Sequence, residues 1–446
     1  MKPVEMRSDP TGDFFRHRLE NMLDMRHELI RLSNFIQWDS LVEEFGSFYS
    51  EGQGRPGKPI RLMAGLILLQ HTYKLSDEEV VMRWRENPYW QYFCGFEYFH
   101  HDFPIDPTSL IKWRKRIGGE GCEKILALTV QAGIESGTLK TSHIKRVIVD
   151  TTVQEKNIAF PTDSALYVKA LEKLTSFAKE LGIELRQTYK RKAKTLALQV
   201  SRYAHANQFK RMRKSLRTLK CLVGRVHRDI QRKASSHDLN KEGLSSLLSL
   251  VDRLLNQTKT TKDKLYSLHA VEVECIGKGK AHKRYEFGNK VAFAIPLKKA
   301  FIVGVNSFQG NPYDGHTLGS SLQKVHELTG IKVEQSFADQ GYKGHGIQET
   351  EVFLSRQKKG ITKTLKRHLK RRQAIEPIIG HMKQDGKLGR NYLKGVTGNE
   401  INAILSGVGF NIRTILNKIN FILQNFLSAF LRIHPSFNRP GSKMTA

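Results

Sequence analysis

The stretch that sets the fold class is Val147-Ile148-Val149-Asp150-Thr151-Thr152. Three consecutive β-branched residues are typical of a short buried strand, and the polar residues after them predict its end. Asp150 would then lie at the carboxyl end of a buried strand, which is where open α/β sheets place their ligands. Taken alone, this aspartate is better explained by hydrogen bonds within a turn.

Strand patterns return after residue 285 and alternate with helical ones. The expected elements are strands at 291–295, 301–308, 332–338 and 351–354, a helix at 317–328, and apolar helices over 400–432 that cover the sheet. The strand at 332–338 is followed directly by Asp339 and then by a glycine turn. These patterns predict an α/β fold in which two aspartates follow two strands.

A third carboxylate, Glu376, stands beside a strongly basic segment. Between Arg356 and Arg372 there are nine basic residues and no acidic one, and such a segment attracts polyphosphate. Phosphate would repel Glu376 unless a divalent cation lay between them, and that arrangement is the chemistry of phosphodiester cleavage. Helical periodicity places Arg372, Glu376 and Lys383 on one stripe beside an apolar stripe. Pro377 predicts a kink just after Glu376.

The plain alternative for this segment is a surface helix with an i,i+4 pair between Arg372 and Glu376. Taken alone, that alternative is the better explanation. However, two strand-terminal aspartates and one helical glutamate occur in the same α/β fold, and each of the three would need its own plain explanation. Because paired Mg²⁺ ions require such carboxylates and little else, the set of three favours a metal-dependent nuclease.

The composition indicates a negatively charged partner. The 446 residues include 73 Lys and Arg against 43 Asp and Glu, a formal net charge of +30, which points to nucleic acid or an anionic membrane. No apolar run reaches the length of a bilayer span and the amino terminus has no apolar signal core, so no membrane partner is expected. Four widely spaced cysteines without a CxxC pair fit a reducing compartment. We therefore expect a bacterial cytoplasmic protein associated with the nucleoid.

Residues 1–140 are expected to form a helical, DNA-binding domain. Ser76-Asp77-Glu78-Glu79 is a capping box that starts one helix. A basic helix over 109–117 follows two others, which resembles helix-turn-helix geometry, although basic helices that merely face solvent share this pattern. The side chains expected to contact DNA here are Lys112, Arg114, Lys115 and Arg116.

Residues 164–270 are expected to form a basic helical insertion. From Arg186 to Lys233 there are 16 basic residues and one acidic residue, Asp229. A face that is merely solvated normally mixes charges of both signs, so this segment favours contact with a polyanion. The side chains expected to follow the DNA backbone are Arg211, Arg213, Lys214 and Arg217.

Four blocks together resemble the DDE transposases of bacterial insertion sequences, within the group named after insertion sequence five. The blocks are residues 147–152, 310–318, 338–342 and 374–381, and they stand in the order expected of the family. Residues 55–115 resemble the helical amino-terminal domain of the group. The resemblance therefore covers nearly the whole chain.

The resemblance implies an RNase H-like catalytic domain made of residues 141–163 and 271–432. In it, Asp150, Asp339 and Glu376 would be the catalytic residues and the ligands of two Mg²⁺ ions, with Mn²⁺ as an alternative cofactor. One ion would activate water or a DNA 3′-hydroxyl, and the other would stabilise the leaving oxygen. The family's arginine and lysine, which have three intervening residues before and six after the glutamate, match Arg372 and Lys383.

These two side chains, together with Lys370 and Arg371, are expected to contact DNA phosphates. The family's tyrosine falls at Leu369 in this chain, so that no side chain carries its role. We expect a transposase that binds the terminal inverted repeats of its element, cleaves and joins double-stranded DNA, and forms a homodimer or larger assembly on it.

Two other classes stay open. A non-catalytic repressor, or a domesticated transposase derivative, would share the charge but would not need the three carboxylates. An RNA-binding or ribosome-associated factor rests on charge alone. Residues 433–446 are expected to form a flexible tail.

Overall fold

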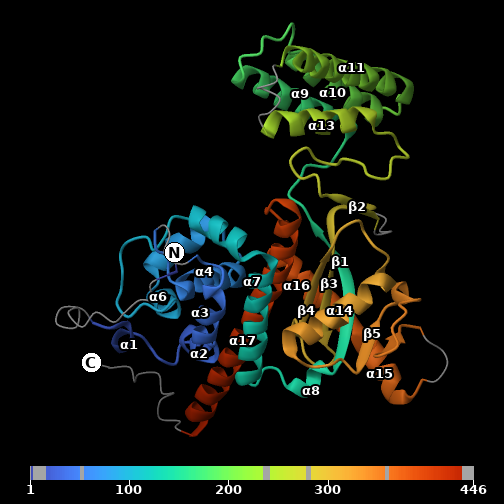
Figure 1. The fold of residues 1–446 in the computed structure, drawn as a ribbon. Coiled ribbons are helices and arrows are strands. Elements are labelled where there is room, and N and C mark those ends of the chain that lie inside the picture. Colours follow the sequence, from blue (N-terminus) through green and yellow to red (C-terminus); the bar gives the residue numbers. More distant parts are fainter. Residues whose placement is uncertain are drawn as a thin grey trace, which may run out of the picture. The chain divides into compact units, whose positions relative to one another are not determined.

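Most strands of a sheet belong to one unit of the chain and a bundle of helices belongs to another, whose range also includes the edge strand β2 (Glu274–Gly277) (Figure 1). The sheet unit comprises Met1–Glu155 and Asn289–Ala446, and the inserted unit comprises Lys156–Gly288. The computed structural model describes residues 2–3, 17–50, 55–234, 242–277, 283–356 and 361–433, except for the side chains of 242 and 423–433. Apart from its first residue, the expected tail at 433–446 lies outside the described residues.

The first part of the sheet unit is helical, as predicted. Its helices are α1 (Leu19–Met22), α2 (Glu28–Phe35), α3 (Trp38–Gly46), α4 (Ile60–Thr72), α5 (Asp77–Glu86), α6 (Pro88–Phe93), α7 (Thr108–Glu135) and α8 (Thr141–Ile144). The predicted capping box is present: the hydroxyl of Ser76 accepts the backbone N–H of Glu79, whose carboxylate accepts the N–H of Ser76. The predicted helix end near residue 117 is confirmed, because the non-helical backbone of Gly118 (φ 60°, ψ −157°) separates α7 into two helical segments.

The strands are β1 (Arg146–Glu155), β2 (Glu274–Gly277), β3 (Tyr285–Pro296), β4 (Gly304–Phe308), β5 (Gln335–Ala338) and β6 (Glu351–Leu354), with α14 (Asp314–Thr329) between β4 and β5. Their order is β2-β3-β1-β5-β6, and β4 pairs with β3. Parallel pairs join β1 to β5 and β5 to β6, whereas β3 pairs antiparallel with β2 and β4. The predicted mixed α/β fold, with a sheet flanked by helices, is confirmed.

Strand β1 does not end at Asp150, as the sequence predicted, but continues to Glu155. Its second half is held by partners that are distant in sequence. Val153 is fully buried, and the buried side-chain amide of Gln154 donates to the side chain of Asn289 and to the carbonyl of Asn399. These contacts satisfy polar residues that would otherwise favour a turn.

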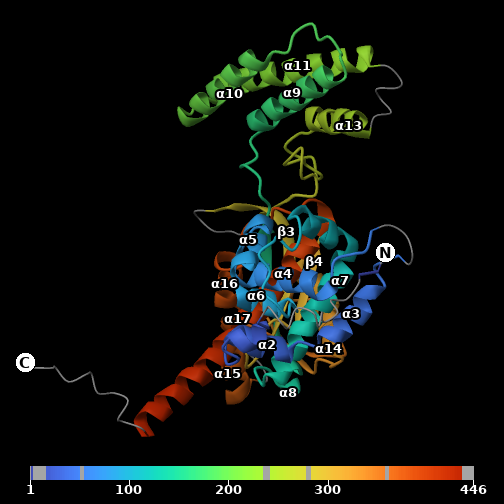
Figure 2. The same ribbon diagram turned by 90° about the vertical axis from the view of Figure 1, so that its left-hand side faces the viewer.

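The carboxyl-terminal helix of the sheet unit, α17 (Gly395–Ile433), packs against α2, α4, α7 and β4. Helices α7 and α17 run side by side, with helices α2, α3, α4 and α6 on one side and the sheet on the other (Figures 1 and 2). The buried side chain of Asn411 bonds the backbone N–H and carbonyl of Ile302 and the hydroxyl of Thr129. One hydrophobic core therefore runs from α2 to the sheet. None of the described helices combines the length and apolar character needed to cross a bilayer.

The inserted unit has its own hydrophobic core, formed by α9 (Asp163–Glu180), α10 (Lys190–His205), α11 (Phe209–Lys233) and α13 (Glu242–Asn256). Its two chain ends meet, because the backbone N–H of Lys156 donates to the carbonyl of Phe287 at 2.9 Å. The predicted helical character of this segment is confirmed. The predicted domain boundaries at residues 140, 163 and 270 stay predictions.

Candidate active site

Asp150 lies on β1, and Asp339 directly follows the neighbouring parallel strand β5. The parallel register of β1 and β5 pairs Ile148 with Phe337, and each aspartate stands two residues further along its strand direction. Asp339 directly follows the last residue of β5 and has extended backbone angles (φ −84°, ψ 172°). The two carboxylates thus follow the carboxyl end of the same parallel pairing, where α/β sheets gather their functional groups.

Short local hydrogen bonds hold both aspartates. The carboxylate of Asp150 accepts the backbone N–H of Thr151 at 2.8 Å. The carboxylate of Asp339 accepts the N–H of Gly341 as it caps the 3-10 turn η2 (Gln340–Tyr342). A Cβ atom at position 341 would lie 3.3 Å from an oxygen of Asp339 and 3.3 Å from one of Asp314, so glycine lets both carboxylates approach this turn.

Arg372 lies between two of the three predicted carboxylates. Its Nη1 is 4.0 Å from Oδ2 of Asp150, and its Nη2 is 4.0 Å from Oε1 of Glu376. The side chain of Arg372 is 11% exposed, whereas that of Glu376 is 66% exposed and therefore free to change rotamer. Arg372 also lines a cavity of about 400 Å³ together with Asp339 and Leu369. One guanidinium thus connects the neighbourhoods of all three carboxylates.

The helix break around Glu376 differs from the prediction. α15 (Lys363–Arg371) is followed by the 3-10 turn η3 (Arg372–Ala374) and by α16 (Ile375–Gln384), so the break precedes Glu376 instead of following it. Pro377 lies in the first turn of α16, where a backbone N–H has no intrahelical partner and proline is tolerated. The apolar stripe of α16 is buried as predicted, with Ile375 and Met382 fully covered.

A cluster of polar side chains around Asp314 was not predicted from the sequence. Nζ of the buried Lys290 lies 2.9 Å from Oδ1 of Asp314 and 2.6 Å from the carbonyl of Pro312. The hydroxyl of Thr151 donates to the same oxygen of Asp314 at 2.9 Å. Burial, and then the charges of Asp150 and Asp314, raise the pKa of the Tyr342 hydroxyl well above its usual range. The available signal was a lysine inside strand β3, whose nine residues after Phe287 are all buried.

The basic side chains predicted to bind DNA fall into different places of the sheet unit. Lys370 is exposed, and Arg371 donates from Nε to the carbonyl of Leu297 at 2.7 Å, which ties α15 to the turn after β3. Lys383 lies two turns after Glu376 and lines a separate cavity of about 740 Å³. The structure therefore brings Arg372 to Asp150 and Glu376.

On α7, three of the four predicted DNA contacts face solvent, namely Lys112, Lys115 and Arg116. Arg114 requires a correction, because it is 5% exposed and its guanidinium bonds the carboxylate of Asp77 at 2.9 and 2.5 Å. It also bonds the side chain of Gln70. Burial of a cation in such a pair explains why this arginine joins helices instead of facing a phosphate.

In the inserted unit, all four predicted DNA contacts on α11 are exposed, namely Arg211, Arg213, Lys214 and Arg217. The opposite side of the helix is buried through Leu219, Val223 and Ile230. The one acidic residue of the basic segment, Asp229, is buried and accepts the backbone N–H of Arg186 at 3.1 Å.

The oxygen chemistry of the three carboxylates suits a hard divalent cation such as Mg²⁺. As the side chains stand, however, the described residues contain no group of three or more His, Cys, Asp or Glu close enough to hold a metal together. The cation that lies between Asp150 and Glu376 is the guanidinium of Arg372. The exposed side chain of Glu376 would have to move toward Asp150 and Asp339 for the three to share an ion.

Comparisons with known proteins agree with the helical amino-terminal part. Residues 17–116 match the family model described as "Transposase domain (DUF772)". A Rhizobium meliloti protein, described as "Uncharacterized protein ORF8 in nfe locus", is 52% identical over 202 residues, which cover 45% of this chain and 97% of that protein. No solved structure matches the chain. The chain therefore belongs to the same family as the ORF8 protein and is a transposase-related protein.

Proposed function

We propose that this protein is a DDE transposase that binds the terminal inverted repeats of a bacterial insertion sequence and catalyses metal-dependent cleavage and strand transfer of double-stranded DNA. The observation that carries the proposal is the matching position of Asp150 and Asp339, each of which stands two residues beyond the last paired residues of β1 and β5, Ile148 and Phe337. The basic segment with Arg372 and Glu376 comes to the same site from another part of the chain.

In this proposal Asp150, Asp339 and Glu376 hold two Mg²⁺ ions, or Mn²⁺ in their place. When bound, such ions supply Lewis-acid activation of a nucleophilic water or 3′-hydroxyl and stabilise the leaving oxygen of an in-line displacement. The carboxylate of Glu376 turns from Arg372 toward the aspartates. The guanidinium of Arg372 is thereby released to donate two hydrogen bonds to a phosphate, which it does better than a lysine because its donors form a planar fork.

Lys290 and Asp314 would position the first aspartate. Asp314 accepts the hydroxyl of Thr151, the residue that follows Asp150, and Lys290 fixes Asp314. The central β1, with parallel β5 and β6 on one side and antiparallel β3 and β4 on the other, supports an RNase H-like core and membership of the insertion-sequence-five group.

Recognition of the terminal repeats is assigned to the amino-terminal helices, with Lys112, Lys115 and Arg116 as contacts. Exposed Lys370 and the arginines of α11 would add contacts to the DNA backbone, which give affinity without reading bases. Two copies of the chain, one for each end of the element, would act together at the bacterial nucleoid.

A cleavage assay tests the catalytic part of the proposal. A plasmid that carries both ends of the element is incubated with the full-length protein, with and without Mg²⁺. We expect strand cleavage that requires the metal and that Asp339→Asn abolishes. Asp263→Asn, which changes an exposed aspartate in the inserted unit, should cut like the wild type. Cutting by Asp339→Asn would end the assignment of this residue.

A second candidate is a non-catalytic DNA-binding repressor or domesticated derivative. The specific observation in its favour is the guanidinium of Arg372, which lies 4.0 Å from the carboxylates of both Asp150 and Glu376. Under this alternative the wild type and Asp339→Asn would bind the element ends equally and neither would cut them with Mg²⁺ or Mn²⁺.

A further inference from the structure

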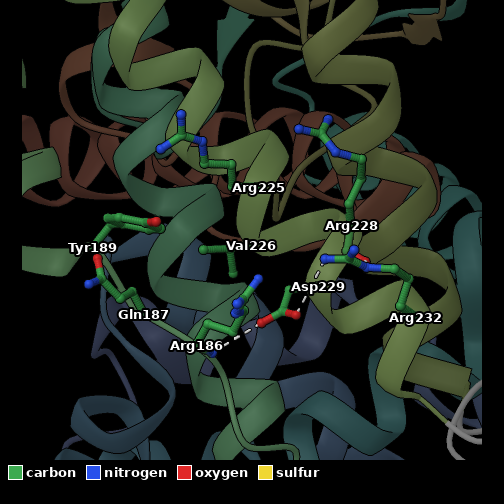
Figure 3. A pocket seen from close by; sticks show the side chains of 8 residues that line it. All are labelled: Arg186, Gln187, Tyr189, Arg225, Val226, Arg228, Asp229 and Arg232. Atoms are coloured by element: carbon green, nitrogen blue, oxygen red, sulfur yellow. Dashed lines mark hydrogen bonds and ion pairs between the residues drawn. The ribbon is translucent and has the colours of Figure 1, made fainter.

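A small cationic cavity in the inserted unit has no role in the proposal so far. Its volume is about 200 Å³, and it lies between the segment before α10 and one side of α11 (Figure 3). Four arginines line it, together with Gln187, Tyr189, Val226 and Asp229; they are Arg186, Arg225, Arg228 and Arg232. Val226 and Asp229 are buried while the arginines are exposed, so the cavity has a closed floor and a cationic rim.

The single carboxylate of the cavity, Asp229, connects the two segments that form it. Asp229 accepts the backbone N–H of Arg186 at 3.1 Å, and one of its oxygens lies 3.6 Å from Nη2 of Arg232 (Figure 3). That backbone hydrogen bond and the neighbouring cations lower the pKa of Asp229, so it stays ionised and holds the segment before α10 against α11.

Asp229 balances only part of the positive charge that the arginines bring to the cavity. Arg225, Arg228 and Arg232 are spaced three and four residues apart and therefore share one side of α11, where like charges repel. Within the part of the chain that the structure describes, the guanidinium groups of Arg186, Arg225 and Arg228 make no hydrogen bond or ion pair. Four guanidinium groups and one carboxylate leave an excess of three positive charges around the cavity.

These features select the ligand. The cavity is smaller than the roughly 300–1,000 Å³ of sites that enclose drug-sized molecules, so it fits a phosphate group but not a whole nucleotide. A closed floor admits a group that ends a chain more easily than one from which the chain must leave again on the far side. A terminal phosphate also carries about −1.5 to −2 charges at neutral pH, against one for a backbone phosphodiester.

We propose that Arg186, Arg225, Arg228 and Arg232 form a binding site for the 5′-terminal phosphate of a DNA strand. The assignment of this source rests on the proposed function. When water attacks a phosphodiester, its oxygen bonds to phosphorus, the bond from phosphorus to the 3′-oxygen breaks, and that oxygen takes up a proton. The products are a 3′-hydroxyl, which strand transfer needs, and a 5′-phosphate, which the cavity would retain.

A binding experiment without metal tests the site apart from catalysis. Full-length protein is titrated in EDTA against two blunt duplexes of one sequence, which differ only in a 5′-phosphate or a 5′-hydroxyl, and binding is followed by fluorescence anisotropy. We expect about tenfold tighter binding of the phosphorylated duplex, as charge-assisted hydrogen bonds would give. Equal binding of the two duplexes would overturn the proposal.

Two double variants of α11 locate the effect. Arg225→Gln with Arg228→Gln should abolish the preference for the phosphorylated duplex. Arg213→Gln with Lys214→Gln removes the same charge from the same helix outside the cavity, and it should weaken both duplexes while the preference survives. Persistence of the preference in the first variant, or its loss in the second, would contradict the site. Thermal melting of both variants checks that they are folded.

A competition arm separates the two sources of the same chemistry. Inorganic phosphate is added at concentrations too low to weaken binding of the 5′-hydroxyl duplex. At these concentrations the preference for the phosphorylated duplex should persist. If inorganic phosphate removes it, the cavity binds free phosphate and the assignment to DNA ends fails. A protein that prefers the phosphorylated end but never cuts DNA with Mg²⁺ would keep the site and end the catalytic proposal.

Discussion

Nζ of Lys290 lies 2.9 Å from Oδ1 of Asp314, which also accepts the hydroxyl of Thr151, the residue after Asp150. The lysine is largely buried, since its side chain is 10% exposed, and it also bonds the carbonyl of Pro312. Lys290→Met keeps the length of the side chain but removes both of these bonds, which leaves the Oδ1 atom of Asp314 with only the hydroxyl of Thr151 as a donor. We expect the free energy of unfolding to fall by about 1–3 kcal/mol in urea titrations.

The same variant should lose DNA cleavage at temperatures where it remains folded, because Asp314 no longer holds Thr151. Lys332→Met is the matched control, since the pair of Lys332 and Glu349 is 68% and 80% exposed. It should change stability by less than about 0.5 kcal/mol and leave cleavage intact. Full cleavage by Lys290→Met would remove this lysine from the site.

Arg114→Met tests whether the buried arginine of α7 is structural. The pair of Arg114 and Asp77 is 6% and 16% exposed, so loss of one partner should cost about 3 kcal/mol of unfolding free energy. Affinity for DNA should not change while the protein is folded. Arg116→Ala should weaken DNA binding and leave the unfolding free energy nearly unchanged. The side chain of Arg116 is exposed to solvent, and its guanidinium lies over the ring of Tyr49 at 4.6 Å.

The acid dependence of stability gives a second measurement on Asp77. Burial raises the pKa of this carboxylate, but the hydrogen bonds and charge of Arg114 outweigh burial and lower it from 3.8. A lowered pKa in the folded state contributes stability above the unfolded value, and this stability is lost as the pH falls through the folded value. The wild type should therefore lose stability in acid below about pH 4, whereas Arg114→Met should lack this part of the loss.

Lys387 should make stability depend on alkaline pH. Burial lowers the pKa of its ammonium group to about 8, although Asp77 acts in the opposite direction. Between this value and the ordinary value of 10.5 the unfolded chain binds more protons, so this group makes stability rise with pH. Lys387→Met should be more stable than the wild type at pH 7, and the difference should shrink toward pH 10. Lys394→Met, an exposed lysine, should show no such trend.

Two helical glycines should respond in opposite directions to alanine. A Cβ at Gly409 of α17 would collide with the backbone carbonyl of His71, so Gly409→Ala should destabilise the protein by about 1–3 kcal/mol. Gly319 of α14 has nothing within 4 Å of that position, so Gly319→Ala should stabilise it by roughly 0.5–1 kcal/mol. Chemical denaturation of both variants measures the difference, and a destabilised Gly319→Ala would contradict this reasoning.

Alanine at Arg211, Arg213, Lys214 and Arg217 tests the DNA contacts of α11. Since phosphate contacts carry no base information, the affinity for all duplexes should fall alike. The slope of log affinity against log salt should flatten by up to about one unit for each lost contact. A loss confined to one sequence would mean that this helix reads bases.

The α/β class and the buried face of α16 could be predicted from sequence because both depend on local periodicity. The features that could not be predicted depend on contacts with residues that are distant in the sequence. β1 continues past Asp150 because Gln154 finds Asn289 and Asn399, and Arg114 is buried because Asp77 lies beside it. Lys290 gave only a weak signal, since a lysine in a strand becomes informative once Asp314 is known to face it.

The hydrogen bond between Lys156 and Phe287 has an evolutionary consequence. A unit whose entry and exit touch can be gained or lost without disturbing its host, as happens at sites of successful domain insertion. Because β1 and β3 are neighbours in the sheet, a short hairpin turn could replace everything between them. The inserted unit is therefore a detachable module, and relatives without it could keep the same three carboxylates and the sheet apart from β2.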